Sequence, residues 1–341
     1  MDNEMPQRAR SARRRLAAAL GAAPLAVLTA RIARAAEAPR AAPADYPARN
    51  IELIVPFAPG GGVDQFARTI GQLLVDQNLV SRPVLTVNRP GAGGAIGMAL
   101  LVQRKGDAYT LLGTGMHPVI TPLMLGTPHS YRNLTPIAKV YSEYTMMVVR
   151  NESPIRGLKD IEAALRKDAS ALTFGGASLG SPDHITAALF ARAVGADASK
   201  INYVPYSGAD SNSAVLGGHV DVGMGGLDVI THVEAGRMRA FAVTSPRRLA
   251  GRFQKLPTFA EQGYDVVVEN WRGLYGPPEM PPAVVQYWRD ALRKMVQSAA
   301  WKNELAKNQW ADSFDTEGFM ASMDKDSLVY GALLKQLGLI K

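Results

Sequence analysis

The chain has 341 residues, of which 47% are hydrophobic and 20% charged, an ordinary composition for a soluble globular protein with core enough for two α/β domains. It contains no cysteine, which excludes disulfides, thiolate metal sites and cysteine nucleophiles, and its five histidines follow no metal-binding spacing. A further unusual bulk property is the formal net charge of +8.

Residues 1–38 are predicted to be an export signal that is cleaved. Three arginines, Arg13 to Arg15, precede an uncharged run from Leu16 to Ala30, and A-x-A cleavage candidates follow at Ala33 to Ala35 and Ala36 to Ala38. The adjacent arginines and the weak hydrophobicity favour the twin-arginine route, with an ordinary secretory signal as the alternative. The uncharged run falls short of the roughly 20 apolar residues that span a bilayer, so a membrane anchor is not expected.

The positive charge belongs mostly to this signal. Removing residues 1–36 takes away seven arginines and two acids and leaves 31 basic against 28 acidic residues, a net charge of about +3. The remaining chain has no basic stripe with interleaved aromatic residues, so nucleic-acid binding is not expected.

The most informative segment is IELIVPFAPGGGVDQFARTI at residues 51–70. An apolar strand runs through three glycines into a helix whose apolar face repeats at Val63, Phe66 and Ile70. Glycines let backbone N–H groups crowd around a ligand at a helix N-terminus, where the helix dipole favours negative charge. A nucleoside triphosphate would require a lysine and a hydroxyl after the turn, and Val63 and Asp64 stand there instead. The turn is predicted to hold a small anion such as a carboxylate.

Short apolar runs then alternate with helical patterns, which predicts an α/β fold with largely parallel sheets flanked by helices. Strands are predicted at 51–57, 84–88, 109–113, 137–149, 171–175, 201–205, 220–224, 239–244 and 266–275. Helices are predicted at 63–77, 94–104, 158–167, 182–194, 208–216, 282–298 and 316–336. Ser181 and Thr316 are candidate N-caps. Trp288, Trp301 and Trp310 are assigned to packing, and Trp271 to hinge or core packing, with ligand stacking as its alternative.

Two lobes are predicted from three strand-to-helix turns, 58–62, 176–182 and 205–208, which would converge at the carboxyl ends of strands. Two crossover segments, 137–149 and 266–275, would join the lobes. The predicted limits are 47–145 plus 269–341 for the first lobe and 146–268 for the second.

Two glycine motifs allow other interpretations. Gly176 to Gly180 reads G-x-S-x-G, the nucleophile elbow, which keeps open an exported serine hydrolase using Ser178 with Asp221 or Asp228 and His232. However, the helix start at Ser181 comes late for an elbow, and no HGGG-like segment is present. Gly91 to Gly97 imitates a dinucleotide fingerprint but lacks the acidic residue expected about 20 positions on. A glycine-rich helix entry packed near the first turn is the simpler interpretation.

The succession YPARNIELIVPFAPGGGVDQFAR, VNRPGAGGAIG, YTLLGTG, GSPDH, NYVPYSGADSNSAVLGGHVD, GRMRAFAVTSPRR, LPTFAEQGY and ENWRGLYGP resembles the Bug-type periplasmic receptors of tripartite tricarboxylate transporters. The resemblance runs from about Tyr46 to the C-terminus. It implies a two-lobed periplasmic binding protein of type II-like fold, without enzymatic activity or cofactor, that closes over a small mono-, di- or tricarboxylate. Delivery to a membrane permease and a monomeric state are further expectations, and a signalling role stays open.

The resemblance also implies which residues contact the solute. Carried over by position, they are Ala58, Gly60, Gly61, Gly62, Asp64, Thr114 and His117 in the first lobe and Ser178, Gly180, Ser181, His184, Tyr206 and Gly225 in the second. An inward-facing Asp64 would repel an anion, so bracing of the turn is the alternative for this residue. Relatives often carry an acidic or amide pair where this chain has Gly225 and Gly226, which favours a plain organic acid over an amino acid.

Overall fold

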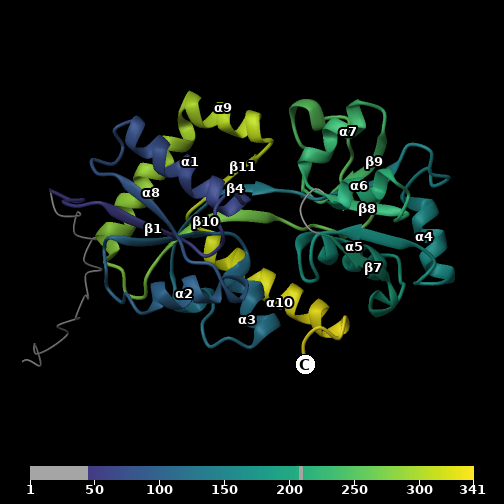
Figure 1. The fold of residues 1–341 in the computed structure, drawn as a ribbon, viewed down its shortest axis with the longest axis horizontal. Coiled ribbons are helices and arrows are strands. Elements are labelled where there is room, and N and C mark those ends of the chain that lie inside the picture. The colour runs from purple at the N-terminus through teal and green to yellow at the C-terminus, as the bar shows by residue number, and fades with distance from the viewer. Residues whose placement is uncertain (1–44, 207–209) are drawn as a thin grey trace, which may run out of the picture. The chain divides into compact units, whose positions relative to one another are not determined.

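Two mixed sheets, each flanked by helices, make up the part of the chain that the computed structural model describes, residues 45–206 and 210–341 (Figure 1). The predicted export signal and the turn residues 207–209 lie outside these ranges. We call the six-stranded sheet with its helices lobe 1 and the five-stranded sheet with its helices lobe 2. The sequence limits predicted for the lobes remain a prediction.

Lobe 1 contains β1 (Ile51–Val55), α1 (Gly62–Asp76), β2 (Val84–Asn88), α2 (Ala95–Val102), β3 (Thr110–Thr114), α3 (His117–Leu125), β4 (Thr135–Glu143), β10 (Asn270–Gly276), α8 (Pro282–Gln297), α9 (Ala299–Asn308), β11 (Ala311–Asp315) and α10 (Phe319–Gln336). Lobe 2 contains β5 (Met146–Arg150), α4 (Leu158–Lys167), β6 (Thr173–Gly176), α5 (Pro182–Ala193), β7 (Asn202–Pro205), α6 (Asp210–Leu216), β8 (Val222–Gly225), α7 (Ile230–Glu234) and β9 (Met238–Val243).

Most strands of each sheet run in one direction, as the sequence predicts. The strand orders are β11-β4-β10-β3-β1-β2 in lobe 1 and β7-β6-β8-β5-β9 in lobe 2. Antiparallel pairing is confined to contacts made by β10, β11 and β5. The carboxyl ends of β1, β2 and β3 therefore share one edge of the first sheet, as do those of β6, β7 and β8 in the second.

Helices cover both faces of the lobe 1 sheet, and β1, β3 and β4 are therefore buried on both sides. The apolar stripes of α1, α8 and α9 pack in one cluster with the sheet, and those of α2, α3 and α10 pack in another. The second cluster continues into lobe 2 through α5, whose contact with α10 joins the lobes. Trp271, Trp288, Trp301 and Trp310 are all buried, which confirms their assignment to packing.

The lobes are joined by crossover segments, as predicted. The apolar run 137–149 is not one strand: β4 ends at Glu143 and β5 begins at Met146 in the other sheet. The returning chain enters β10 at Asn270. Between the sheets, the buried Thr244 hydroxyl accepts from the Thr145 N–H (3.0 Å) and donates to the Val268 carbonyl (2.8 Å), so one side chain ties the outgoing segment to the returning one.

Several elements differ from the sequence prediction. Thr316 is not the N-cap of the last helix, because that helix starts after Gly318. Helices α3, α7 and α9 and strand β11 were not predicted. α9 buries only Trp301 and so lacks a clear apolar repeat, and Pro118 and Pro122 interrupt the pattern of α3. Ser181 is the N-cap of α5, as predicted, with its hydroxyl accepting from the His184 N–H.

Candidate functional site

The glycine turn between β1 and α1 is exposed and its helix start carries no side-chain cap. Residues Ala58 to Gly62 are all exposed, Gly60 adopts a φ of +86°, and the N-cap residue is Gly61. The first N–H groups of a helix have no partner inside the helix, and no side chain accepts from them here. Gly61, Gly62 and the start of α1 thus offer backbone donors and a partial positive charge to a ligand.

Asp64 braces this turn. Its carboxylate accepts from the Gly60 N–H, the Arg68 Nε–H and the Asn88 side-chain amide, each at 2.9 Å, and the residue is only 3% exposed. The hydrogen bond from Arg68 is the main cause that lowers the pKa of Asp64 to about 2. All these partners of the carboxylate belong to lobe 1, and its hydrogen bond to the Gly60 N–H holds the turn in place.

The end of β3 places a hydroxyl and an imidazole close to the turn. The Thr114 hydroxyl lies 3.3 Å from His117 Nδ1, and the His117 ring lies 4.3 Å from the Phe57 ring, centroid to centroid. Burial, with a smaller contribution from the Arg272 guanidinium, lowers the pKa of His117 to about 3. His117 is therefore neutral near pH 7 and can donate or accept one hydrogen bond through each ring nitrogen.

Arg272 is a residue of this region that sequence reasoning missed. A Cβ atom placed on Gly62 would lie 3.6 Å from Arg272 Nη2, and one on Gly115 would lie 3.1 Å from Nη1. The guanidinium is therefore packed against the glycine turn. Arg272 is 7% exposed and pairs with Glu143 at the end of β4, but its Nε has no hydrogen-bond partner among residues 45–206 and 210–341.

The glycine-rich strand-to-helix entry at residues 91–97 packs against the same turn. A Cβ on Gly94 would lie 3.3 Å from the Phe57 ring, and one on Gly97 would lie 2.7 Å from Pro56 Cβ. Larger residues at either position would push into the segment that leads to the turn. The packing interpretation of these glycines is confirmed.

In lobe 2, the turn before α5 brings together four of the predicted residues. The Gly180 N–H donates to His184 Nδ1 at 3.1 Å, Gly180 has a φ of +77°, and Ser178 is exposed. A Cβ on Gly180 would lie 3.4 Å from Met124 Cε of α3, so this turn contacts lobe 1 directly. Burial lowers the pKa of His184 to about 4, which keeps this imidazole neutral as well.

The remaining predicted residues of lobe 2 differ in accessibility. Tyr206 is partly buried and its N–H donates to the Gly176 carbonyl at 2.8 Å, directly before the undescribed residues 207–209. Gly225 is buried in β8, where a Cβ would lie 2.4 Å from Val229 Cγ2. Close packing thus explains the glycine at position 225 without a ligand.

The structure offers no support for the hydrolase interpretation. Within residues 45–206 and 210–341, no hydrogen bond joins the Ser178 hydroxyl to a histidine, and His184 Nδ1 instead accepts from the backbone. The same residues contain no cluster of three or more His, Cys, Asp or Glu side chains that could hold a metal ion. None of the helices in the described ranges is long and apolar enough to cross a membrane.

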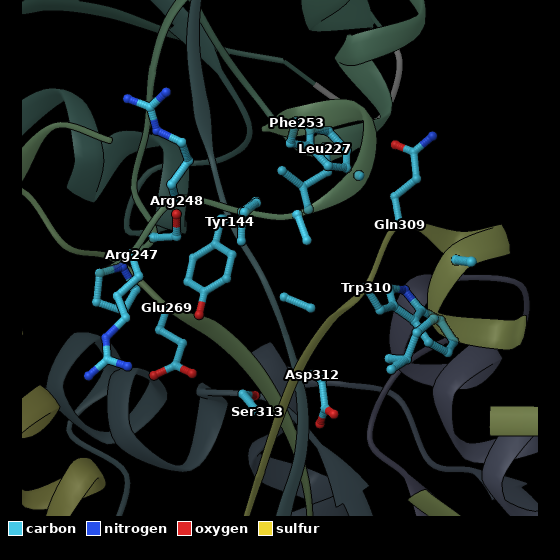
Figure 2. Close-up of a pocket in the computed structure, with 18 of the residues that line it drawn as sticks. Tyr144, Leu227, Arg247, Arg248, Phe253, Glu269, Gln309, Trp310, Asp312 and Ser313 are labelled. Atoms are coloured by element: carbon cyan, nitrogen blue, oxygen red, sulfur yellow. The ribbon is translucent and has the colours of Figure 1, made fainter. Parts of the chain in front are cut away.

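A separate cavity of about 980 Å³ lies elsewhere in the described part of the chain. It is lined by the β11 edge of lobe 1, the C-terminal part of α9, and the segment 245–253 that follows β9 (Figure 2). None of the residues predicted to bind the solute lines it. The glycine turn and this cavity are therefore separate features, and we base the candidate solute site on the turn because its exposed amides carry the chemistry that an anion requires.

Comparison with known proteins decides the family. Residues 67–339 match the family model described as the tripartite tricarboxylate transporter family receptor. The chain belongs to this receptor family. The protein BugT of Bordetella pertussis is 32% identical over 310 residues, which cover 87% of this chain and 93% of BugT.

Solved structures share the two-lobed fold of this receptor. A TctC solute-binding protein from Polaromonas, solved without ligand, is 29% identical with a TM-score of 0.76 and covers 86% of this chain and all of its own. More distant structures include an R. palustris protein with adipate (23% identical, TM-score 0.70, 86% of this chain and 99% of its own) and MatC from Rhodopseudomonas palustris with bound malate (20%, 0.64, 87% and 100%).

Proposed function

We propose that this receptor captures a small carboxylate-bearing metabolite between its lobes, with the acid group held at the glycine turn. The observation that carries the proposal is an exposed, uncapped helix start with the buried Arg272 guanidinium packed against it. Oriented amides and a cation together stabilise a carboxylate through charge-assisted hydrogen bonds. The malate and adipate bound by two proteins of the same fold support an organic acid.

Each lobe contributes in a different way. Lobe 1 supplies the N–H groups of the turn, the Thr114 hydroxyl and the neutral His117 imidazole, with Asp64 as a brace rather than a contact. Lobe 2 supplies Ser178, the turn capped by Ser181, and Tyr206. These groups donate hydrogen bonds without adding a carboxylate, which favours a plain organic acid over an amino acid. The number of carboxylates on the solute stays open.

The biological setting is part of the same proposal. Residues 1–38 act as a cleaved export signal, by the twin-arginine route in the favoured interpretation, and the mature monomer works in the periplasm. There it delivers the solute to a membrane permease of the tripartite tricarboxylate transporter type. Membership of this transporter receptor family supports the periplasmic setting and the delivery to such a permease.

A glycine substitution at the turn tests the proposal. A Cβ on Gly61 would meet nothing closer than the Ala58 carbonyl oxygen at 4.0 Å, and its φ of −82° suits any residue, so Gly61→Val should fold normally. The valine side chain would nevertheless cover the amides that the solute requires. We expect Gly61→Val to weaken binding of the best organic acid at least about tenfold, roughly 1.4 kcal/mol, in calorimetric titrations.

The matched control is Gly157→Val, because Gly157 is the N-cap of α4, has an extended backbone and has open space around its Cβ position. The solute is first identified by a thermal-shift screen of mono-, di- and tricarboxylates, in which a ligand at 100 times its dissociation constant adds about 2.7 kcal/mol of stability. Equal affinities for Gly61→Val and the unmodified protein would refute the turn as the solute site.

A further inference from the structure

We propose that the cavity between the β11 edge and residues 245–253 is a second ligand site, which takes an amphipathic organic anion: a carboxylate or sulfonate on an aromatic or branched apolar body. Its volume of about 980 Å³ lies at the upper end of the range typical of small-molecule sites, and it lies between two lobes, where such sites are common.

The walls of the cavity are largely apolar and come from both lobes. Tyr144, Leu249 and Phe253 line it from lobe 2 and the segment leading out of lobe 1, and Trp310 and Phe314 line it from the β11 side. Figure 2 shows the Tyr144 ring between the arginine side and the Trp310 side of the cavity. An apolar ligand body would bury these aromatic surfaces, and each square ångström of apolar surface removed from water contributes about 25 cal/mol.

One polar group in the wall lacks a partner. Ser245 is 1% exposed and lines the cavity, yet its hydroxyl makes no hydrogen bond to any residue that the structure describes. Buried hydroxyls are almost always paired, so an unpaired one in a cavity wall indicates a partner supplied by a ligand or by water. The nearby Lys139 and Glu269 are paired with each other at 2.8 Å and leave the hydroxyl of Ser245 as an available donor.

The charge around the cavity selects an anion. Five basic residues line it against two acids, Glu269 and Asp312. Three of the five are neutralised, Lys139 by Glu269, Arg248 by Glu261 and Arg252 by Glu234. Arg247 and Lys302 form no ion pair with any described residue.

These two cations come from different lobes. Arg247 belongs to the segment after β9, and Lys302 lies on α9. Both side chains are exposed. An anionic group beside either cation would offset its charge, while the apolar body would fill the aromatic part of the cavity. This site shares no lining residue with the glycine turn, so the inference does not depend on the proposed solute site.

The test uses naphthalene-2-sulfonate as the probe and 2-naphthalenemethanol as its uncharged counterpart, titrated calorimetrically into the mature protein. We expect one saturable site for the sulfonate and affinity for the alcohol at least about tenfold weaker, because the alcohol cannot balance Arg247 and Lys302. Absence of saturable sulfonate binding, or equal affinity for both probes, would overturn the proposal.

Charge reversal locates the probe. The double variant Arg247→Glu with Lys302→Glu should weaken sulfonate binding at least about tenfold. The control pair Lys255→Glu with Lys294→Glu changes the net charge equally at exposed positions outside the cavity and should leave binding unchanged. Equal loss in both pairs would show long-range attraction only, and loss of probe binding in Gly61→Val would place the probe at the glycine turn. Either result contradicts a second site.

Discussion

Arg272 is the residue whose surroundings bear most directly on solute binding. Its guanidinium is packed against the glycine turn, is 7% exposed and shares its charge with Glu143. A buried arginine that already has a carboxylate partner can bind a second one only in competition with the first. Glu143 should therefore set how much of the positive charge of Arg272 reaches the solute.

Changing Glu143 alone and changing Glu143 together with Arg272 should have opposite effects on the affinity for the organic acid. Glu143→Gln removes the competing charge but keeps a hydrogen-bond acceptor, so affinity for the organic acid should increase severalfold. Glu143→Gln combined with Arg272→Met removes both charges without leaving either one buried alone, so affinity should fall about tenfold. Calorimetric titration of both variants decides the matter. Changes in the same direction would show that Arg272 acts through packing alone.

His117 determines a pH dependence of stability. The pKa of His117 is lowered to about 3 in the folded protein, whereas an unfolded histidine titrates near 6.5. Between these values the unfolded chain binds more protons, so the free energy of unfolding should decrease as the pH falls from about 6.5 to about 3. Urea unfolding of the unmodified protein and His117→Gln at pH 7 and pH 4.5 measures this. The variant should lose less stability between the two pH values, and an equal loss would contradict a neutral His117.

At the scale of single residues, the sequence could predict the roles of some positions and not of others. The glycine turn and the Ser181 cap were predictable because φ preferences and capping hydrogen bonds are local. Arg272 was not, because which face of β10 it occupies depends on pairing with β3 and β4, far away in sequence. Gly225 illustrates the reverse case, since a glycine in a buried strand signals a ligand contact and tight packing equally well.

Among the elements, α10 carries a partly buried carboxyl group toward the crossover. Asp326 accepts a hydrogen bond from Trp271 Nε1 at 3.0 Å, and burial raises the pKa of Asp326 to about 6. Glu269 raises this pKa further, and Lys139 and Lys325 lower it. Because the folded pKa exceeds the unfolded one, the folded state binds the proton more tightly, and stability is lost as the pH rises through about 6.

Replacing the carboxyl group by an amide should therefore stabilise the protein. Asp326→Asn keeps an oxygen that can accept from Trp271 and avoids a buried charge, so we expect about 1 to 2 kcal/mol of additional stability at pH 8. Below about pH 3.8 the difference should vanish, because Asp326 is then protonated in both the folded and the unfolded protein. Thermal unfolding at both pH values provides the measurement, with Asp290→Asn, whose side chain is half exposed, as the control. A stabilisation independent of pH would exclude the titration of Asp326 as its cause.

Element prediction succeeded where periodicity was uninterrupted. The stripe of Val63, Phe66, Ile70 and Leu74 defined α1, and all four residues are buried. β11 was missed because ADSFD is short and mostly polar and pairs only with β4 at the edge of the sheet, so its strand conformation depends on its partner.

At the scale of the whole molecule, the crossover segments suit a hinge. Only Tyr144 and Thr145 separate β4 from β5, and Thr244 ties the outgoing and returning segments together. Hinge closure concentrates backbone changes in a few residues of this kind while each lobe moves as a rigid body. Binding of the solute between the lobes should therefore change their separation and leave each lobe unchanged.

The absence of cysteine from the chain makes this measurable with paired labels. Arg82→Cys and Lys200→Cys place spin labels at exposed positions of lobe 1 and lobe 2, and Arg82→Cys with Lys294→Cys places both in lobe 1. We expect pulsed dipolar distances between the lobes to shift by several ångströms when the organic acid identified in the screen is added. Distances within lobe 1 should stay constant. If calorimetry shows saturation while the interlobe distance is unchanged, the solute binds without closure and the proposed capture mechanism is wrong.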